Sequence, residues 1–239
     1  MRSRLLLAIG AAMLLAPTTA HAVAVSFSVA DFDDVSQIVN SGNLLFAANA
    51  GAPAGSDVTL NGVTFAGGVQ VYDDENVFTD TAAYDSNAHS IAGLTDAQAN
   101  LLLDPFAFGN AVNNVEITLS GLTIGREYLL QFISVDDRPA AEGRLLDVGS
   151  GSDFADGVAL DNLDYTRDMP LLISGQFLAD ATSQVISVGI EGTLGRGHVN
   201  AFQLREAPLV VVPEPSTLVL IGLGALVCAF GASRKRRRG

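Results

Sequence analysis

The sequence predicts an all-β protein whose body is an antiparallel β-sandwich with one short helix. Short runs of β-branched and aromatic residues alternate with turns rich in Gly, Asn, Asp and Ser, which is typical of many short antiparallel strands. Only one stretch of the body carries both a start and a stop signal for a helix. Turn spacing of this kind favours a sandwich over a parallel α/β sheet.

Both ends of the chain predict membrane targeting. Charged Arg2 and Arg4, an apolar run and the small-x-small site Ala20-His21-Ala22 form a secretory signal peptide. Near the other end, an uncharged apolar run is long enough for a transmembrane helix, and the basic residues after it stay in the cytoplasm. The expected parts are a signal peptide (1–22), a sandwich domain (23–208), a linker (209–215), a transmembrane helix (216–233) and a basic tail (234–239).

The body between these ends is strongly acidic. It holds six Arg and no Lys against 25 Asp and Glu, a formal charge of −19. This charge repels nucleic acid and anionic lipid and attracts cations, among which calcium is abundant outside cells. The single cysteine, Cys228, lies in the apolar run, so the body forms no disulfide and depends on its core for stability.

The strand signals of the body follow one another at short intervals. A first strand is expected over residues 23–29, and Asn61-Gly62 within the alternating residues 57–65 predicts a hairpin, because both residues tolerate positive φ. Residues 69–72 extend that unit. Further strands are expected over residues 115–119, 127–135, 144–148, 171–178, 184–190 and 198–204.

The helix and two long loops lie between these strands. Thr95 and Gln98 stand at capping-box spacing before a short apolar run that ends at Asp104-Pro105, which predicts one short helix. Residues 73–90 and 149–168, which are rich in Asp, Asn, Gly and Ser, are expected to be long loops.

The C-terminal residues resemble the bacterial PEP-CTERM sorting signal. Val212-Pro213-Glu214-Pro215 precedes an apolar run rich in Leu, Ala and Gly, and an Arg/Lys cluster ends the chain. The resemblance implies that an exosortase, a membrane-embedded transpeptidase-like enzyme, recognises Pro213, Glu214 and Pro215, while signal peptidase removes the other end. It also implies a transient stay in the inner membrane, then the cell surface or the extracellular matrix, together with exopolysaccharide production. A plain single-span anchor without processing is the alternative.

Several segments of the body resemble galactose-binding-like and malectin-like jelly rolls. In the main one, residues 119–128, the pattern Leu-x-Gly-Leu-x-x-Gly-x-x-Tyr leads into a core strand. The other matching segments are residues 58–65, 135–138, 175–180 and 199–205. The resemblance implies a jelly-roll-like sandwich, and members of such modules bind sugars, bind other ligands or only fill space.

Sugar binding suits a sandwich with long loops at one end, because aromatic rings stack on sugar faces while Asp, Asn or Arg bonds the hydroxyls. Against this, the body has no Trp, Tyr128 is expected in the core, and residues 136–138 also fit a simple charged turn. The candidate ligand contacts are Tyr72, Tyr84, Asp136, Asp137, Arg138 and Tyr165.

An acidic loop is the candidate metal site. Calcium takes six to eight oxygen ligands, and a loop of aspartates among glycines and serines offers carboxylates and carbonyls. The spacing is not that of an EF-hand, and a solvated acidic loop is the alternative. No other cofactor is indicated. The candidate ligands are Asp153, Asp156, Asp161 and Asp164, with Asp168 beside them.

No catalytic set stands out in the body. Its acids offer many carboxylate pairs and no preferred one, and there is no Gly-x-Ser-x-Gly elbow. The only imidazole bases are His89 and His198, both expected to be surface or capping residues. We therefore expect a non-catalytic carbohydrate-binding, adhesion or exopolysaccharide-associated protein. The alternative is a secreted carbohydrate-active enzyme, a glycoside hydrolase or lyase.

Overall fold

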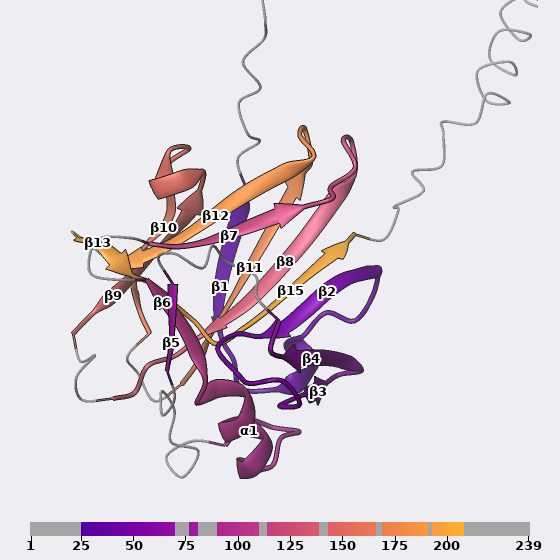
Figure 1. Ribbon diagram of the computed structural model, residues 1–239. Helices are drawn as coiled ribbons and strands as arrows, with labels where there is room; N and C mark the ends of the chain where they lie inside the picture. Colours follow the sequence, from indigo (N-terminus) through magenta and orange to yellow (C-terminus); the bar gives the residue numbers. More distant parts are fainter. Residues whose placement is uncertain are drawn as a thin grey trace, which may run out of the picture. The chain divides into compact units, whose positions relative to one another are not determined.

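The computed structural model describes residues 25–69, 77–80, 90–109, 114–138, 143–165, 169–190 and 193–207 (Figure 1). The chain divides into two compact units, Met1–Ala207 and Pro208–Gly239. The signal peptide, the transmembrane helix 216–233 and the basic tail that the sequence predicts lie outside the described residues. Within those ranges, no helix has the length and apolar character needed to cross a membrane.

The larger sheet has seven strands in the order β1-β11-β8-β15-β2-β4-β3. Its pairs are antiparallel, as predicted, except that β2 and β4 pair in parallel. The strands are β1 (Ser26–Asp31), β2 (Asn43–Asn49), β3 (Val58–Leu60), β4 (Val63–Gly67), β8 (Glu127–Ser134), β11 (Leu171–Leu178) and β15 (Ala201–Glu206).

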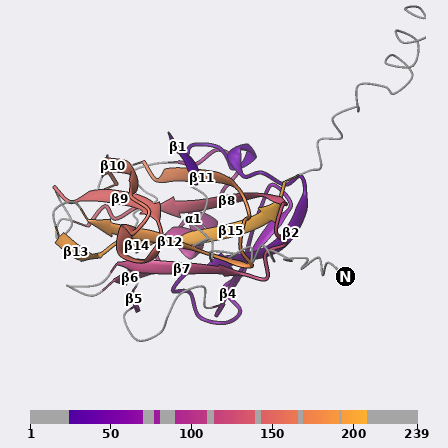
Figure 2. The same ribbon diagram turned by 90° about the horizontal axis from the view of Figure 1, so that it is seen from above.

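A smaller sheet faces the first, and a short third sheet lies beside them. Seen from above, the axes of β7 and β12 in the smaller sheet are roughly aligned with those of β8 and β15 in the larger one (Figure 2). The smaller sheet contains β10 (Val158–Asp164), β9 (Leu145–Ser150), β12 (Ser183–Ile190), β13 (Thr193–Arg196) and β7 (Val115–Ser120), and the third contains β14 (His198–Val199), β6 (Phe106–Gly109) and β5 (Val77–Asp80).

Two hydrophobic clusters hold these elements together. In the first, Ile117 and Val188 of the smaller sheet pack with Leu130 and Phe132 of the larger one. The second joins β3 and β4 to the helix through residues such as Leu102. Each large apolar side chain buried in this way contributes roughly 1.5–3 kcal/mol, so these clusters supply the stability that a body without disulfides needs.

Two local predictions are confirmed. Asn61 (φ 44°) and Gly62 (φ 79°) form the two-residue turn that pairs Leu60 with Val63. The helix α1 (Asp96–Leu103) begins at the predicted capping box of Thr95 and Gln98. Two single-turn 3₁₀ helices, Val35–Gln37 and Ser152–Phe154, complete the described elements.

The motif at residues 119–128 forms a tight corner at the start of β8. Gly121 and Gly125 have φ of 73° and 81°, a region that favours glycine. The hydroxyl of Tyr128 accepts a hydrogen bond from the backbone N of Thr123 at 2.8 Å. Tyr128 is buried in the core, as predicted, and its ring stacks on Phe177. The motif therefore serves the fold.

Five strands lie where the sequence analysis placed none: β2, β5, β6, β10 and β13. The loop expected over residues 73–90 is wrong in part, because it contains β5. The expected loop 149–168 is wrong, because β10 occupies its second half. The residues of β10 are mostly exposed, its register with β9 is irregular, and Asn162 has φ of 59°. As an outer strand of its sheet, β10 has only β9 as a partner among the described strands, so its sequence lacks the apolar alternation of an inner strand. The strand expected over 198–204 is interrupted at Asn200.

Candidate functional site

Three of the six residues predicted to contact sugar meet at the end of β8. Asp136 and Arg138 follow β8, and Tyr165 follows β10. The backbone N of Asp136 donates a hydrogen bond to the carbonyl of Tyr165 at 3.0 Å, which joins the two strand ends. His198 of β14 and Phe106 of β6 complete the group. We call Phe106, Asp136, Arg138, Tyr165 and His198 the buried cluster.

A two-point ion pair links the charged members. Arg138 donates from Nε to Oδ1 of Asp136 at 2.6 Å and from Nη2 to Oδ2 at 2.7 Å. The side chain of Asp136 is 1% exposed and that of Arg138 is 29% exposed. The carboxylate is therefore buried behind its partner, and Arg138 is the member of the cluster that reaches solvent. Charge-assisted pairs of this geometry are the stronger kind of hydrogen bond.

Aromatic rings pack around His198. Its imidazole stacks on Phe106 at a centroid distance of 3.9 Å and lies 5.7 Å from the ring of Tyr165. The guanidinium carbon of Arg138 lies 4.5 Å from the centre of the Phe106 ring, a cation–π contact. Phe106 is thus in contact with both the imidazole and the guanidinium.

His198 is a neutral base inside the fold. Burial lowers its pKa well below 6.5, and the positive charges of Arg138 and Arg144 lower that pKa further. Its Nδ1 lies 3.5 Å from Oδ2 of Asp136, which is long for a hydrogen bond. His198 is 2% exposed, so the expectation of a surface or capping residue is wrong. A core position for this imidazole follows from its stacking on Phe106.

The phenol of Tyr165 is also buried and stays protonated at physiological pH. Burial raises its pKa to about 12, with the negative charge of Asp136 acting in the same direction and the positive charges of Arg144 and Arg138 against it. Arg144 comes near the hydroxyl without completing a hydrogen bond of good geometry. Because the residue has an exposed fraction of 0%, its ring can stack on a sugar only after the cluster opens.

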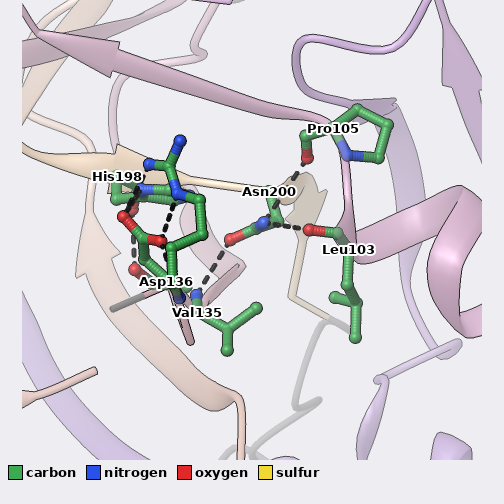
Figure 3. Close-up of polar contacts among 8 residues, drawn as sticks. Leu103, Pro105, Val135, Asp136, His198 and Asn200 are labelled. Carbon is green, nitrogen blue, oxygen red and sulfur yellow. Dashed lines mark hydrogen bonds and ion pairs between the residues drawn. The ribbon is translucent and has the colours of Figure 1, made fainter. Parts of the chain in front are cut away.

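Asn200 lies beside the cluster, between it and the residues Leu103 and Pro105 (Figure 3). Its Oδ1 accepts a hydrogen bond from the backbone N of Val135 at 2.9 Å. Its Nδ2 donates to the carbonyls of Leu103 at 2.5 Å and Pro105 at 3.4 Å. Val135 and Pro105 each precede a member of the buried cluster, so one buried amide sets the spacing between β8, β6 and the end of α1.

The neutral state of His198 predicts a loss of stability in mild acid. The unfolded chain takes up a proton below about pH 6.5, whereas the folded protein does not until its lower pKa is reached. The stabilising contribution is therefore complete above pH 6.5 and decreases as the pH falls below it, by up to about 1.4 kcal/mol per pH unit. Urea denaturation between pH 7.0 and 5.5 measures this slope.

The matched control for this slope uses the other histidine of the body. His198→Gln should remove the slope, and His89→Gln should keep it. An NMR titration of the His198 imidazole in the unchanged protein gives an independent readout. A His198 resonance that titrates near pH 6.5 in the folded protein would contradict the prediction.

The two buried tyrosines should respond differently to loss of their hydroxyls. Tyr128→Phe removes the hydrogen bond from Thr123 and should lower the free energy of unfolding by about 1–2 kcal/mol. Tyr165→Phe removes a hydroxyl with no partner of good geometry and should change it by less than about 0.5 kcal/mol, or raise it. Thermal denaturation of both variants tests this, and equal losses would refute it.

The four predicted calcium ligands lie along one segment. Asp153 lies in the second 3₁₀ turn at a φ of 49°, Asp156 follows that turn, and Asp161 and Asp164 lie in β10. All four side chains are exposed. Across the part of the chain that the structure describes, no group of three or more His, Cys, Asp or Glu is placed to hold a metal. Asp168 lies outside that part, so calcium binding stays a prediction.

The other predicted residues fall into two groups. Asp137 is half-buried between Asp136 and Arg138. Outside the described residues lie Tyr72, Tyr84, Pro213, Glu214 and Pro215.

Sequence reasoning missed Phe106 and Asn200 as parts of this site. One signal was available, because His198 and Asn200 are polar residues two apart in an otherwise apolar run. Alternating residues of a strand share a face, and polar residues on a core-facing side need buried partners. The partners themselves lie far away in sequence.

Comparison with solved structures finds distant similarities. The ANX2 ectodomain from Arabidopsis thaliana matches with a TM-score of 0.47 and 10% identity over 70% of this chain and 50% of that one. A β-glucuronidase from Bacteroides uniformis matches with a TM-score of 0.43 and 12% identity over 73% and 19%. The CBM22-1 xylan-binding domain of Paenibacillus barcinonensis Xyn10C matches with a TM-score of 0.39 and 10% identity over 71% and 97%. This chain thus covers half or less of the length of the first two proteins.

Comparison of sequences gives a match at the C-terminus. No curated protein matches the chain. Residues 211–237 match the model of the PEP-CTERM protein-sorting motif, which includes the predicted Pro-Glu-Pro step and the basic cluster that follows the apolar run. The tail of this chain is therefore a PEP-CTERM sorting signal, which marks an exported protein sorted at the membrane toward the cell surface.

Proposed function

We propose that this chain is an exosortase substrate whose body acts at the cell surface or in the extracellular matrix as a non-catalytic, polysaccharide-associated module. The observation that carries this proposal is the sorting motif at residues 211–237. The predicted signal peptide over residues 1–22 directs the body out of the cytoplasm. The tail then holds the protein in the inner membrane until an exosortase acts near Pro213, Glu214 and Pro215.

The chemistry of the buried cluster supports binding over catalysis. Glycoside hydrolysis uses two carboxylates that flank an open cleft. Asp136 is buried, and both of its oxygens accept hydrogen bonds from Arg138. His198 is equally closed off from solvent in this conformation.

The acidic body supports a polysaccharide as the partner. A formal charge of −19 repels nucleic acid and anionic lipid surfaces. Uncharged sugars avoid this repulsion, and calcium bound to exposed acids such as Asp161 and Asp164 would bridge the body to an acidic polymer. The expected partner is the exopolysaccharide of the producing cell.

Processing of the tail is the first test. Intact-mass analysis of the protein recovered from the producing cell should show loss of residues 1–22 and of the chain beyond the Pro-Glu-Pro step. Glu214→Ala should leave the full tail in place and the protein in the inner membrane, whereas Pro208→Ala, upstream of the motif, should be processed normally. A wild-type protein that keeps its complete tail would identify the plain membrane anchor instead.

Binding is the second test. The protein recovered from the cell should sediment with exopolysaccharide purified from the same cell. Measurements with added calcium and with chelator show whether the acidic segment contributes. If no exopolysaccharide is retained under either condition, the body has a structural role only.

A secreted carbohydrate-active enzyme is the second candidate function. The observation that favours it is the neutral imidazole of His198 beside the phenol of Tyr165, since a neutral base and a phenol are groups that remove and deliver protons. Incubation with the same exopolysaccharide distinguishes the two. New reducing ends or unsaturated sugar products would establish the enzyme and reject the non-catalytic module.

A further inference from the structure

Two polar atoms of the buried cluster have no hydrogen-bond partner among the described residues. They are the hydroxyl oxygen of Tyr165 and Nε2 of His198, in residues that are 0% and 2% exposed. Folded proteins rarely leave buried polar groups unsatisfied, because desolvation without a replacement bond is unfavourable. Two such atoms on neighbouring rings, with centroids 5.7 Å apart, indicate a place where another molecule completes the hydrogen bonding.

The groups around these atoms are those that recognise sugars. The Tyr165 hydroxyl both donates and accepts, and Nε2 of His198 does one or the other according to its tautomer. The carboxylate of Asp136 accepts from hydroxyl groups, and the ring of Phe106 offers an apolar face. The guanidinium groups of Arg138 and Arg144 offset the charge of Asp136 at this place. The body as a whole carries a formal charge of −19, so a neutral sugar meets less repulsion than a uronate.

Arg138 lies over two members of this set, Phe106 and Asp136. Its guanidinium lies over the ring of Phe106 and forms the two-point pair with Asp136, while part of its side chain is in solvent. Withdrawal of this one side chain would expose the ring and the carboxylate together. Opening breaks a two-point pair and leaves the carboxylate of Asp136, which is 1% exposed, without its partner, so the closed arrangement predominates.

We infer that the buried cluster is a closed binding site for one residue of a neutral polysaccharide, with Tyr165 and His198 bonding its hydroxyls and Arg138 as the cover. The class of ligand rests on the proposed function; the location and the cover come from the geometry of the cluster. The apparent affinity of a closed site is reduced by the fraction of molecules that are open. A variant in which the cover is held less firmly should therefore bind sugar more tightly.

NMR titration of the mature protein tests the inference. The probes are neutral gluco-, manno-, galacto- and xylo-oligosaccharides, with oligogalacturonate as the charged comparison. At least one neutral probe should shift the ring resonances of His198 and Tyr165. Arg138→Gln should bind that probe about fivefold more tightly, since it loses the pair with Asp136, and Tyr165→Phe should bind it about tenfold more weakly.

The chain offers a matched control for the loss of positive charge. Arg126 precedes β8 at the strand's other end, so Arg126→Gln changes the net charge equally and should leave the affinity unchanged. Circular dichroism checks that each variant is folded. Weaker binding by Arg138→Gln would show that Arg138 contacts the ligand, and would reject its role as the cover of the site. Unchanged binding by Tyr165→Phe would remove Tyr165 from the site.

The failure of this inference is distinguishable from failure of the proposed function. If the protein is processed and retains exopolysaccharide while no neutral probe shifts His198 or Tyr165, the proposed function stands and this site is rejected. The same result with an ordered water between the two atoms in a crystal structure would assign them to a buried water. If neither processing nor retention occurs, the proposed function itself fails.

Discussion

Replacing Asn200 with alanine should lower the free energy of unfolding of the body by about 3 kcal/mol. Asn200 has an exposed fraction of 0%, and its amide satisfies one backbone N–H and two carbonyl groups. Alanine leaves these groups, in Val135, Leu103 and Pro105, without their partner in a place that water does not reach. Urea denaturation followed by circular dichroism measures the loss.

An exposed asparagine provides the control for this substitution. Asn40 donates one hydrogen bond, to the carbonyl of Asn61 at 3.1 Å, at the surface. Asn40→Ala should therefore change the free energy of unfolding by about 0.5 kcal/mol or less. Similar losses for the two variants would show that the buried amide does not hold α1, β6 and β8 together. Because the buried cluster depends on that spacing, Asn200→Ala should also perturb the NMR signals of His198.

Gly197→Ala should be at least as damaging, with a loss of more than about 3 kcal/mol or a failure to fold. A Cβ at this position would collide with the carbonyl group of Val188 in β12. Backbone atoms inside a sheet cannot rotate away as a side chain can, so a strand has to move. Gly197 directly precedes His198, and its carbonyl accepts a hydrogen bond from the backbone N of Gly109. Expression yield and thermal denaturation measure the effect.

Gly55 provides a control that separates the two effects of a glycine substitution, the steric collision of the new Cβ and the strain of a left-handed backbone. Gly55 has a φ of 89°, and no atom lies within 4 Å of where its Cβ would be. Gly55→Ala should therefore cost only about 1 kcal/mol, from the left-handed backbone alone. If Gly197→Ala were no worse than Gly55→Ala, the close contact between Gly197 and β12 would be refuted.

Local chemistry explains which elements could be predicted. The capping box at Thr95 and Gln98, the Asn61-Gly62 turn and the motif ending at Tyr128 each depend on residues within ten positions of one another. Their geometry is set by side-chain bonds to nearby backbone or by positive φ, so the sequence pattern contains all the partners. The residues over 171–178 form β11 with the predicted bounds, because a strand between two others buries most of its side chains and therefore carries a clear apolar pattern.

Outer strands and very short strands were not predicted from the sequence. β10 is an outer strand with exposed aspartates, so solvent tolerates residues that an inner strand would exclude. Three of the four residues of β6 are buried, and its partners, including β14, are distant in sequence. A run of four residues is too short to show a recognisable period. In both cases the strand exists because of what lies beside it.

For the candidate site, the identity of three residues could be predicted from the sequence, but their burial could not. Asp136, Arg138 and Tyr165 could be named because their side chains suit sugar chemistry, and the structure brings these three together. Their burial could not be predicted, because it follows from a backbone hydrogen bond between residues 136 and 165 and from the stacking of His198 on Phe106. The sequence around His198 does not show that Phe106, which is 92 positions away, is the ring on which it stacks.

The amino-acid order was sufficient for the sorting tail, the hairpin, the helix and the corner before β8. A sorting signal is read as a linear string, and turns and caps close over a few residues. The closed, neutral cluster of Phe106, Asp136, Arg138, Tyr165 and His198 required the tertiary structure. Its members come from four separate parts of the chain, and their burial and pKa values exist only once the strand ends are packed together.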